Sequence, residues 1–263
     1  MTRDRWTGGD DYDAYIGRWS RPVAVAFVNW LAVNAGRDWV DVGCGTGALS
    51  AAILAGAAPA SVVGIDPSAD FVNAAAARVD DRRGRFVVGA AAAVPLESAA
   101  ADVVVSGLVL NFVPDLDVAL AEMLRVTRAG GIVAGYVWDY AGGMELIRRF
   151  WDAAVELDPA ARDLDEGIRF PICAPGPLQT AFESAGLAGV EVRPIDVATV
   201  FRDFDDYWTP FLSGVGPAPG YAAALETARR AALRDRLDAT LPREPDGRIA
   251  LTARAWAVQG WRP

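Results

Sequence analysis

The stretch Trp39-Val40-Asp41-Val42-Gly43-Cys44-Gly45-Thr46-Gly47 decides the fold, together with the alanine-rich residues 48–56 that follow it. A short apolar run leads into glycines at every second position, and a helix-forming stretch comes next. This order predicts a β-strand, a glycine turn and a helix. A residue without a Cβ lets a ligand come close to the backbone, and the N-terminus of the helix offers free N–H groups to it. The alternative is a glycine turn that serves packing alone.

A second strand that ends in an acid favours ligand binding. Residues 61–66 read Ser-Val-Val-Gly-Ile-Asp, which is typical of a buried strand. Asp66 follows Gly47 by about 20 residues, and in doubly wound α/β folds an acid at the tip of the second strand accepts hydrogen bonds from ribose hydroxyls. The two features together predict a nucleoside-binding α/β domain.

The glycine spacing separates this chain from the dinucleotide-binding proteins. Their fingerprint is G-x-G-x-x-G, whereas residues 43–47 read G-x-G-x-G behind an acid. This pattern resembles the first motif of the class I, Rossmann-like S-adenosylmethionine-dependent methyltransferases, and Asp66-Pro67-Ser68 resembles the turn after their second strand. The resemblance covers roughly residues 12–138, is to the members that act on small molecules, and implies S-adenosyl-L-methionine as the cofactor.

The resemblance also implies which residues bind the cofactor. They are Tyr12, Tyr15 and Arg18 toward the methionine carboxylate, Asp41, Gly43, Cys44, Gly45 and Gly47 in the glycine turn, Asp66 and Pro67 at the ribose, Ala90 and Ala91 at the adenine, and Ser106 and Leu108 after the fourth strand. The sequence departs from the family at two positions. Ala90 stands where the family has an acid that contacts adenine, and Asn111 stands where many members have histidine.

The substrate side is predicted from residues after the fourth and fifth strands. Asp139 and Tyr140 are the candidates for a catalytic base, because a phenol acceptor, with a pKa of about 10, would need one. The substrate-binding candidates are Asn111, Trp138, Tyr140, Tyr207 and Trp208. For the aromatic residues among them, packing in the core is the alternative.

Composition excludes several kinds of chemistry. The 263 residues contain no histidine and no lysine, which removes histidine bases, Ser-His-Asp triads, Schiff-base lysines and P-loop lysines. The net charge of −9 argues against nucleic acid as a partner, since phosphate binding uses a basic face. No metal site is expected, because Cys44 and Cys173 follow no ligand pattern. No apolar run reaches the roughly 18 residues of a membrane span, and the polar N-terminus resembles no signal peptide, so a cytoplasmic protein without membrane contact is expected.

The pattern of strands and helices predicts one doubly wound domain over residues 1–263, with a mostly parallel, seven-stranded sheet and helices on both faces. Residues 1–36 would form an N-terminal clasp and an entry helix, residues 37–138 the cofactor-binding core, and residues 139–187 and 198–248 a helical lid after strands five and six. The strands are expected at 39–42, 61–66, 84–88, 102–106, 132–138, 189–197 and 249–258. Helices are expected at about 22–33, 68–79, 118–127, 144–157, 178–185, 203–212 and 221–241, and glycines 130 and 131 should end the helix 118–127.

The hypothesis that follows is methyl transfer from S-adenosylmethionine to a small, apolar or aromatic metabolite. Three alternatives stay open. The sheet could carry a nicotinamide-dependent oxidoreductase, although the glycine spacing and the absence of lysine oppose that. The domain could bind S-adenosylmethionine, or have lost it, and act as a non-enzymatic module. The fold could also serve another reaction such as cyclisation or decarboxylation. The oligomeric state and the acceptor atom do not follow from the sequence.

Overall fold

The computed structural model describes residues 13–263, with side chains from Tyr15 onward. The described chain divides into two compact units. We call them the sheet unit (residues 20–137, 172–195 and 255–263) and the helical unit (residues 13–19, 138–171 and 196–254). None of the helices in residues 13–263 is both long and apolar enough to cross a bilayer.

The central element of the fold is a seven-stranded sheet. Its strands are β1 (Asp38–Val42), β2 (Ser61–Asp66), β3 (Gly84–Val88), β4 (Ala101–Gly107), β5 (Thr127–Trp138), β6 (Ala188–Phe201) and β7 (Ile249–Trp261). Their order is β3-β2-β1-β4-β5-β7-β6, and β1 to β5 pair in parallel. Strand β7 runs antiparallel to β5, since Gly130 and Gly131 near the start of β5 exchange backbone hydrogen bonds with Arg262 at the end of β7. The predicted seven-stranded, mostly parallel sheet is therefore confirmed.

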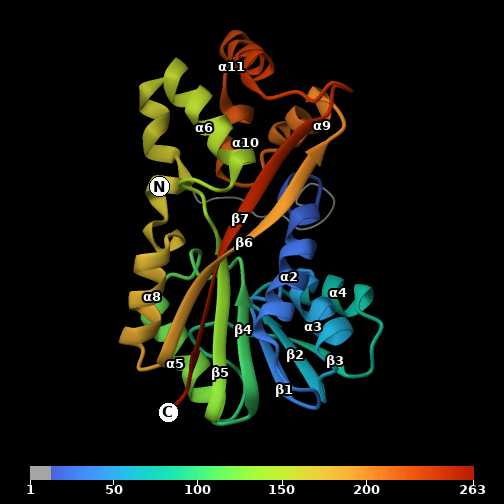
Figure 1. Ribbon diagram of the computed structural model, residues 1–263, viewed down its shortest axis with the longest axis vertical. Coiled ribbons are helices and arrows are strands. Elements are labelled where there is room, and N and C mark those ends of the chain that lie inside the picture. The colour runs from blue at the N-terminus through green and yellow to red at the C-terminus, as the bar shows by residue number, and fades with distance from the viewer. Residues whose placement is uncertain (1–12) are drawn as a thin grey trace. The chain divides into compact units, whose positions relative to one another are not determined.

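Helices cover both faces of the parallel strands. Helices α2 (Arg18–Leu31), α3 (Ala48–Gly56) and α4 (Ala69–Arg78) lie on one side, and α5 (Leu116–Val126) and α8 (Pro175–Ser184) on the other (Figure 1). Strands covered on both faces read as continuous apolar runs, and β1 and β4 follow this rule, with Val40 and Val104 almost fully buried. On α2, Phe27 packs against Tyr136 of β5 with 4.7 Å between ring centroids. The crossover topology brings the carboxyl ends of β1, β2 and β4 to one edge of the sheet.

The helical unit is built around aromatic side chains. Its elements are the π-helix η1 (Asp13–Gly17), α6 (Glu145–Leu157), the 3-10 helix η2 (Pro159–Leu164), α7 (Glu166–Arg169), α9 (Phe204–Trp208), the 3-10 helix η4 (Thr209–Leu212), α10 (Pro217–Ala224) and α11 (Thr227–Thr240). Phe150 of α6 stacks on Phe211 of η4 at 4.5 Å, and Tyr207 of α9 lies 5.4 Å from Phe211. Most of the two predicted lid segments thus folds into this unit, whereas residues 172–187 belong to the sheet unit. A lid function stays a prediction.

The predicted glycine stop after the helix 118–127 is wrong. Helix α5 ends at Val126, and Thr127 already has the extended conformation with which β5 begins. Gly130 and Gly131 lie inside β5, where the register of its pairing with β4 shifts. A Cβ on Gly131 would lie 2.6 Å from the carbonyl oxygen of Asp102. Gly131 therefore allows a close approach of two strands, and Gly130 has a positive φ of 71° within β5, so neither residue ends a helix.

The helical segments also differ from the prediction in detail. The stretch between the predicted helices 144–157 and 178–185 contains η2, α7 and the 3-10 helix η3 (Pro171–Cys173), and the predicted helix 203–212 divides into α9 and η4. The stretch 214–220, between two predicted helices, includes the first turn of α10. The predicted helix 221–241 is interrupted at Leu225, whose backbone is extended (φ −67°, ψ 141°). Hydrophobic periodicity does not detect such a break, because the apolar residues continue across it.

Candidate functional site

The glycine turn after β1 has the conformation that its sequence requires. Gly43 and Gly45 have φ angles of +78° and +50°, which L-residues with a side chain adopt with strain. A Cβ on Gly43 would lie 2.6 Å from Val109 Cγ1, so glycine is needed there for packing. Within the described part of the chain, a Cβ on Gly45 would have no heavy atom within 4 Å. The backbone at Gly45 thus faces open space among these residues, and a ligand can approach it.

Strand β2 holds this turn in place through backbone and side-chain acceptors. The N–H groups of Gly43 and Cys44 both donate to the carbonyl of Ile65, at 2.7 and 3.0 Å. The N–H of Gly45 donates to Asp66 Oδ2 at 3.0 Å, and the N–H of Ser68 donates to Asp66 Oδ1 at 2.9 Å. One carboxylate therefore joins the glycine turn of β1 to the turn after β2.

Asp66 keeps the capacity to bind a ligand. Each carboxylate oxygen carries two lone pairs, so each can accept one hydrogen bond beyond the one it takes from the backbone. The residue is 7% exposed, at the edge where β1 and β2 end. Burial raises the pKa of Asp66, and the N–H groups of Ser68 and Gly45 oppose that rise. The geometry fits a pair of ribose hydroxyls at Asp66 beside the open backbone of Gly45.

Asp41 supports the turn from within. Its side chain is completely buried, and Oδ2 accepts a hydrogen bond of 2.7 Å from Ser50 Oγ in the first turn of α3. Burial raises the pKa of Asp41 to about 7, and the hydrogen bonds from Ser50 partly oppose this. Asp41 is thus placed to orient α3 against β1. Sequence analysis did not identify Ser50, although its place in the first turn of α3 is a usable signal.

The remaining residues of the turn pack rather than react. Cys44 is 6% exposed, and burial raises the pKa of its thiol well above the usual range, so the thiol stays neutral. Pro67 is exposed, and Ser68 after it caps α4 by accepting from the N–H of Phe71 at 3.3 Å. Serine is among the residues that are preferred at the N-cap of a helix.

The predicted adenine segment forms a tight turn next to Asp66. The N–H of Gly89 donates to the carbonyl of Asp66 at 3.0 Å, and the N–H of Ala93 donates to the carbonyl of Ala90 at 3.0 Å. Ala90 is exposed and Ala91 is half-buried. The sheet unit therefore brings the predicted adenine and ribose segments together.

The end of β4 contributes buried polar atoms that have no partner. Ser106 is completely buried and its Oγ forms no hydrogen bond with the residues that the structure describes, and the same holds for the buried Nδ2 atom of Asn111. Between them, Leu108 has a φ of +62°, and its N–H donates to the carbonyl of Tyr136 at 2.8 Å. A buried donor without a partner costs about 1–3 kcal/mol. Such atoms are candidates for contact with a ligand.

The structure places the predicted clasp residues that it describes in the helical unit. Tyr12 lies outside the described residues. Tyr15 is 1% exposed, and its hydroxyl has no hydrogen-bond partner among residues 13–263. The Arg18 guanidinium lies over the rings of Trp19 and Phe201, at 4.5 and 4.7 Å, and its Nη1 pairs with Asp206 Oδ1 at 3.1 Å. Nε and Nη2 of Arg18 are buried and have no acceptor.

The candidates for the substrate side also lie in the helical unit, except Asn111. Both carboxylate oxygens of Asp139 accept backbone hydrogen bonds, from Gly142 at 3.1 Å and Gly143 at 2.8 Å, so this acid shapes a turn. Tyr207 is completely buried and its hydroxyl donates to the carbonyl of Leu146 at 3.0 Å. Trp138 and Tyr140 are 2% exposed and Trp208 is 5% exposed. These aromatic residues therefore pack in the core of the helical unit, which is the alternative to substrate binding.

Glu166 is a buried acid that sequence analysis did not identify. It is 1% exposed, and its Oε2 accepts a hydrogen bond from Trp151 Nε1. Burial raises the pKa of Glu166 to about 7, and the hydrogen bonds and Arg169 partly oppose this. The four-residue helix α7 is too short for a periodic pattern, so the sequence carries no signal that this acid turns inward.

Comparisons with known proteins agree with this geometry. A family model described as a methyltransferase domain matches residues 40–135. A demethylmenaquinone methyltransferase from Roseiflexus sp. (strain RS-1) is 34% identical over 95 residues, which cover 36% of this chain and 40% of that protein. The match thus spans less than half the length of this relative. The family model covers the glycine turn, Asp66, the Ala90 turn and the end of β4.

Solved structures share the fold at low sequence identity. The YcgJ protein from Bacillus subtilis superposes with a TM-score of 0.61 at 15% identity, over 92% of this chain and 98% of that protein. A phosphoethanolamine N-methyltransferase from Haemonchus contortus, solved with S-adenosylhomocysteine, gives 0.60 at 14% identity, over 96% of this chain and 57% of that protein. Residues 40–135 thus match a methyltransferase domain, and the chain shares its overall fold with these solved proteins.

Proposed function

We propose that this protein transfers a methyl group from S-adenosylmethionine to a small, apolar or aromatic metabolite. One observation carries the proposal: Asp66 accepts from the N–H of Gly45 and keeps free lone pairs at the edge where the backbone of Gly45 faces open space. A nucleoside with two ribose hydroxyls suits that arrangement. The Rossmann-like family to which residues 40–135 belong uses this cofactor.

The residues of the chain would act mainly by positioning. When bound, S-adenosylmethionine supplies a methyl group on a sulfonium leaving group, so the acceptor needs to be held in line with that methyl group. Such positioning contributes about 7–11 kcal/mol in favourable cases. Asp66 would fix the ribose, and the unpartnered donors of Ser106 and Asn111 would orient groups beside it. A phenol or other weak acid would also have to lose a proton, and we keep Asp139 and Tyr140 as candidates for that role.

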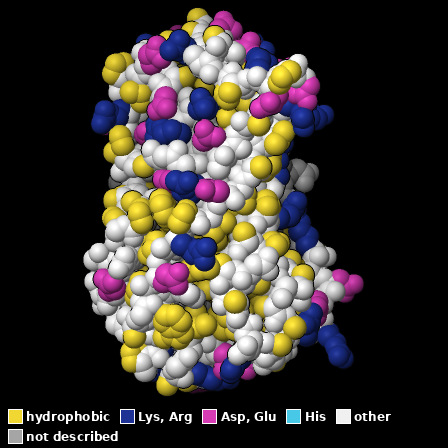
Figure 2. All heavy atoms as spheres, viewed as in Figure 1, with side chains coloured by type: hydrophobic (Ala, Val, Ile, Leu, Met, Phe, Trp, Pro, Cys, Tyr) yellow, Lys and Arg dark blue, Asp and Glu magenta, His cyan; other side chains and the backbone are white. Residues whose placement is uncertain are grey.

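The charge of the chain favours a small acceptor over a nucleic acid. The formal net charge is −9. On the face drawn in Figure 2, arginine and acidic side chains alternate rather than form a continuous basic stripe. Ion pairs such as Arg236–Glu156 and Arg254–Asp196 illustrate this pattern in the helical unit. The Roseiflexus relative is named for demethylmenaquinone as its acceptor, which supports a small acceptor here. We place the reaction in the cytoplasm.

Transfer of a labelled methyl group tests this function. The full-length protein would be incubated with methyl-labelled S-adenosylmethionine and separate phenol, quinol, amine and carboxylate acceptors. We expect label in an organic-extractable product, with one S-adenosylhomocysteine formed per methyl group. Binding of the cofactor without label in any product would favour a non-enzymatic module. This alternative is considered because the chain departs from the family pattern at Ala90 and Asn111.

Arg18 provides a prediction about the methionine carboxylate. Replacing Arg18 with alanine should weaken binding of S-adenosylhomocysteine by about 1.5–3 kcal/mol, because a charged hydrogen bond is lost. Adenosine, which lacks the carboxylate, should bind almost as before. Calorimetry with both ligands measures the difference. The matched control is Arg202→Ala, because Arg202 also faces Asp206, at 3.7 Å, yet its side chain is 83% exposed. Equal losses for both ligands would mean that Arg18 acts through folding.

Ala90 provides a prediction about adenine. If stacking and backbone hold the adenine, Ala90→Asp adds an acceptor for its amino group, and the upper limit of the gain is about a hundredfold in affinity. Ala90 is exposed, so the new carboxylate stays largely hydrated. The control is Ala92→Asp in the same turn, which should leave calorimetric affinity for S-adenosylhomocysteine unchanged. A folded Ala90→Asp variant that binds no better would show that another group already satisfies the amino nitrogen.

A further inference from the structure

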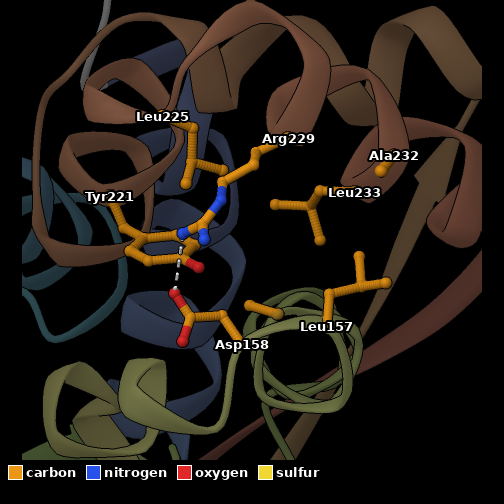
Figure 3. A pocket seen from close by; sticks show the side chains of 8 residues that line it. Leu157, Asp158, Tyr221, Leu225, Arg229, Ala232 and Leu233 are labelled. Carbon is orange, nitrogen blue, oxygen red and sulfur yellow. Dashed lines mark hydrogen bonds and ion pairs between the residues drawn. The ribbon is translucent and has the colours of Figure 1, made fainter.

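The helical unit contains a pocket beside the break between α10 and α11 (Figure 3). The break at Leu225 is fixed by Arg230. Its Nε donates to the carbonyl of Ala222 at 3.0 Å, and its Nη2 donates to the carbonyls of Ala223 and Leu225 at 3.0 and 2.7 Å. The last carbonyls of a helix have few partners within the helix, and here one arginine donates to two of them, those of Ala222 and Ala223, and to the carbonyl of Leu225 at the break. The break is thus a defined feature of the fold, and Leu225 contributes to the pocket wall.

The pocket is apolar over most of its wall and has the size of one ring. Leu157 at the end of α6, Leu225, Leu233 of α11 and the ring of Tyr221 surround a space of about 120 Å³. For comparison, an apolar cavity of roughly 150 Å³ takes up benzene. Trp151 lies behind Tyr221, with 5.5 Å between ring centroids. A single six-membered ring therefore suits this space in both size and polarity.

One edge of the pocket is polar but has no net charge. Arg229 Nη1 pairs with Asp158 Oδ2 at 3.4 Å, which is long for an ion pair, and Asp158 Oδ1 accepts from the N–H of Ala160 at 3.1 Å. Figure 3 shows the hydroxyl of Tyr221 close to this pair. Burial raises the pKa of Tyr221, the charge of Asp158 adds to the rise and that of Arg229 opposes it, so the hydroxyl is neutral at pH 7. The edge offers both donors and acceptors.

We propose that this pocket binds a neutral aromatic ring with one hydroxyl group, a phenol, whose ring lies among the leucines and whose hydroxyl lies at Asp158 and Tyr221. A hydroxyl both donates and accepts, which matches the mixed edge, whereas a carboxylate would bring a second negative charge next to Asp158. This inference goes beyond methyl transfer. It rests on the lining of the helical unit alone, and its test uses neither cofactor nor turnover.

Titration of the full-length protein with p-cresol tests the pocket. We expect saturable heat with a dissociation constant on the order of 1 mM or tighter, as an eight-atom ligand permits. In protein labelled with ¹³C at leucine methyl groups, Leu157, Leu225 and Leu233 should shift along the same saturation curve. Ala232→Phe, at the pocket wall, should weaken binding by about tenfold or more, because the added ring occupies the space. Ala231→Phe, at the neighbouring exposed position of α11, is the matched control and should bind normally.

A second variant tests the hydroxyl. Asp158→Asn keeps a side chain that can cap η2, so folding should be preserved. This variant should bind p-cresol severalfold more weakly, and its affinity for toluene should be unchanged. Absence of saturable binding of p-cresol would show that the space is only a packing void. Equal loss in Ala232→Phe and Ala231→Phe would place the ligand elsewhere, and tighter binding of benzoate than of p-cresol would contradict the proposed ligand class.

Discussion

Replacing Asp66 with alanine should weaken the binding of S-adenosylhomocysteine by about 10- to 150-fold. This range corresponds to about 1.5–3 kcal/mol for hydrogen bonds that involve a charged group. The side chain would bind the ribose, and it also holds the N–H groups of Gly45 and Ser68. Its removal therefore takes away a ligand contact and loosens the turn that presents the backbone. Calorimetric titration of the folded variant measures the loss.

Two further variants separate these contributions. Asp66→Asn keeps one carbonyl acceptor, so its affinity for S-adenosylhomocysteine should lie between those of the wild type and of Asp66→Ala. Asp81→Ala is the matched control, since Asp81 also accepts a backbone N–H two residues on, from Arg83 at 2.9 Å, but precedes β3. It should leave the affinity unchanged. An unchanged dissociation constant in a folded Asp66→Ala variant would show that the ribose binds elsewhere.

Replacing Glu166 with glutamine should remove a loss of stability that the wild type shows as the pH rises. Burial raises the pKa of this carboxyl from 4.5 to about 7 in the folded chain. Because the folded state holds the proton more tightly, the contribution of Glu166 to stability is fully present below pH 4.5. It decreases between pH 4.5 and 7 and is constant above that. The expected loss is on the order of 2–3 kcal/mol.

Chemical unfolding at pH 5 and pH 8 measures this effect. From pH 5 to pH 8, the free energy of unfolding of the wild type should decrease by about 2–3 kcal/mol more than that of Glu166→Gln. Glutamine retains an oxygen that accepts from Trp151 Nε1, so the substitution removes the titration and keeps the shape. Asp41, whose pKa is raised to about 7 by burial, titrates equally in both proteins and cancels in the difference. Parallel stability profiles would show that water reaches Glu166 and that its pKa is ordinary.

Strands β1, β2 and β4 of the cofactor-binding core could be predicted from the sequence because most of their residues are buried and therefore apolar. Strands β2 and β3 have the predicted bounds, and β1 and β4 begin one residue earlier. The contact between Gly45 and Asp66 also follows from the sequence, since parallel strands that end at one sheet edge bring their last residues together. At these positions, the local sequence pattern and the burial in the folded sheet favour the same types of residue.

The helical unit could not be predicted as well, since packing between distant segments decides its structure. Gly130 and Gly131 resemble a helix stop, but both lie inside β5, and Gly131 allows the close approach of β5 to Asp102 of β4. The break at Leu225 is held by three hydrogen bonds from Arg230, and the hydrophobic periodicity of the sequence does not predict them. An aromatic residue such as Tyr207 suits a pocket and a core equally well, and only its burial and its bond to Leu146 distinguish the two.

The binding of S-adenosylhomocysteine to the wild-type protein tests the central claim most directly. In a calorimetric titration, we expect saturable binding of S-adenosylhomocysteine and of S-adenosylmethionine, and no heat of binding with NAD or NADP. The glycine turn at residues 43–47 and the carboxylate of Asp66 are the structural reasons for that selectivity. Tight binding of NADP with no response to S-adenosylhomocysteine would contradict the account.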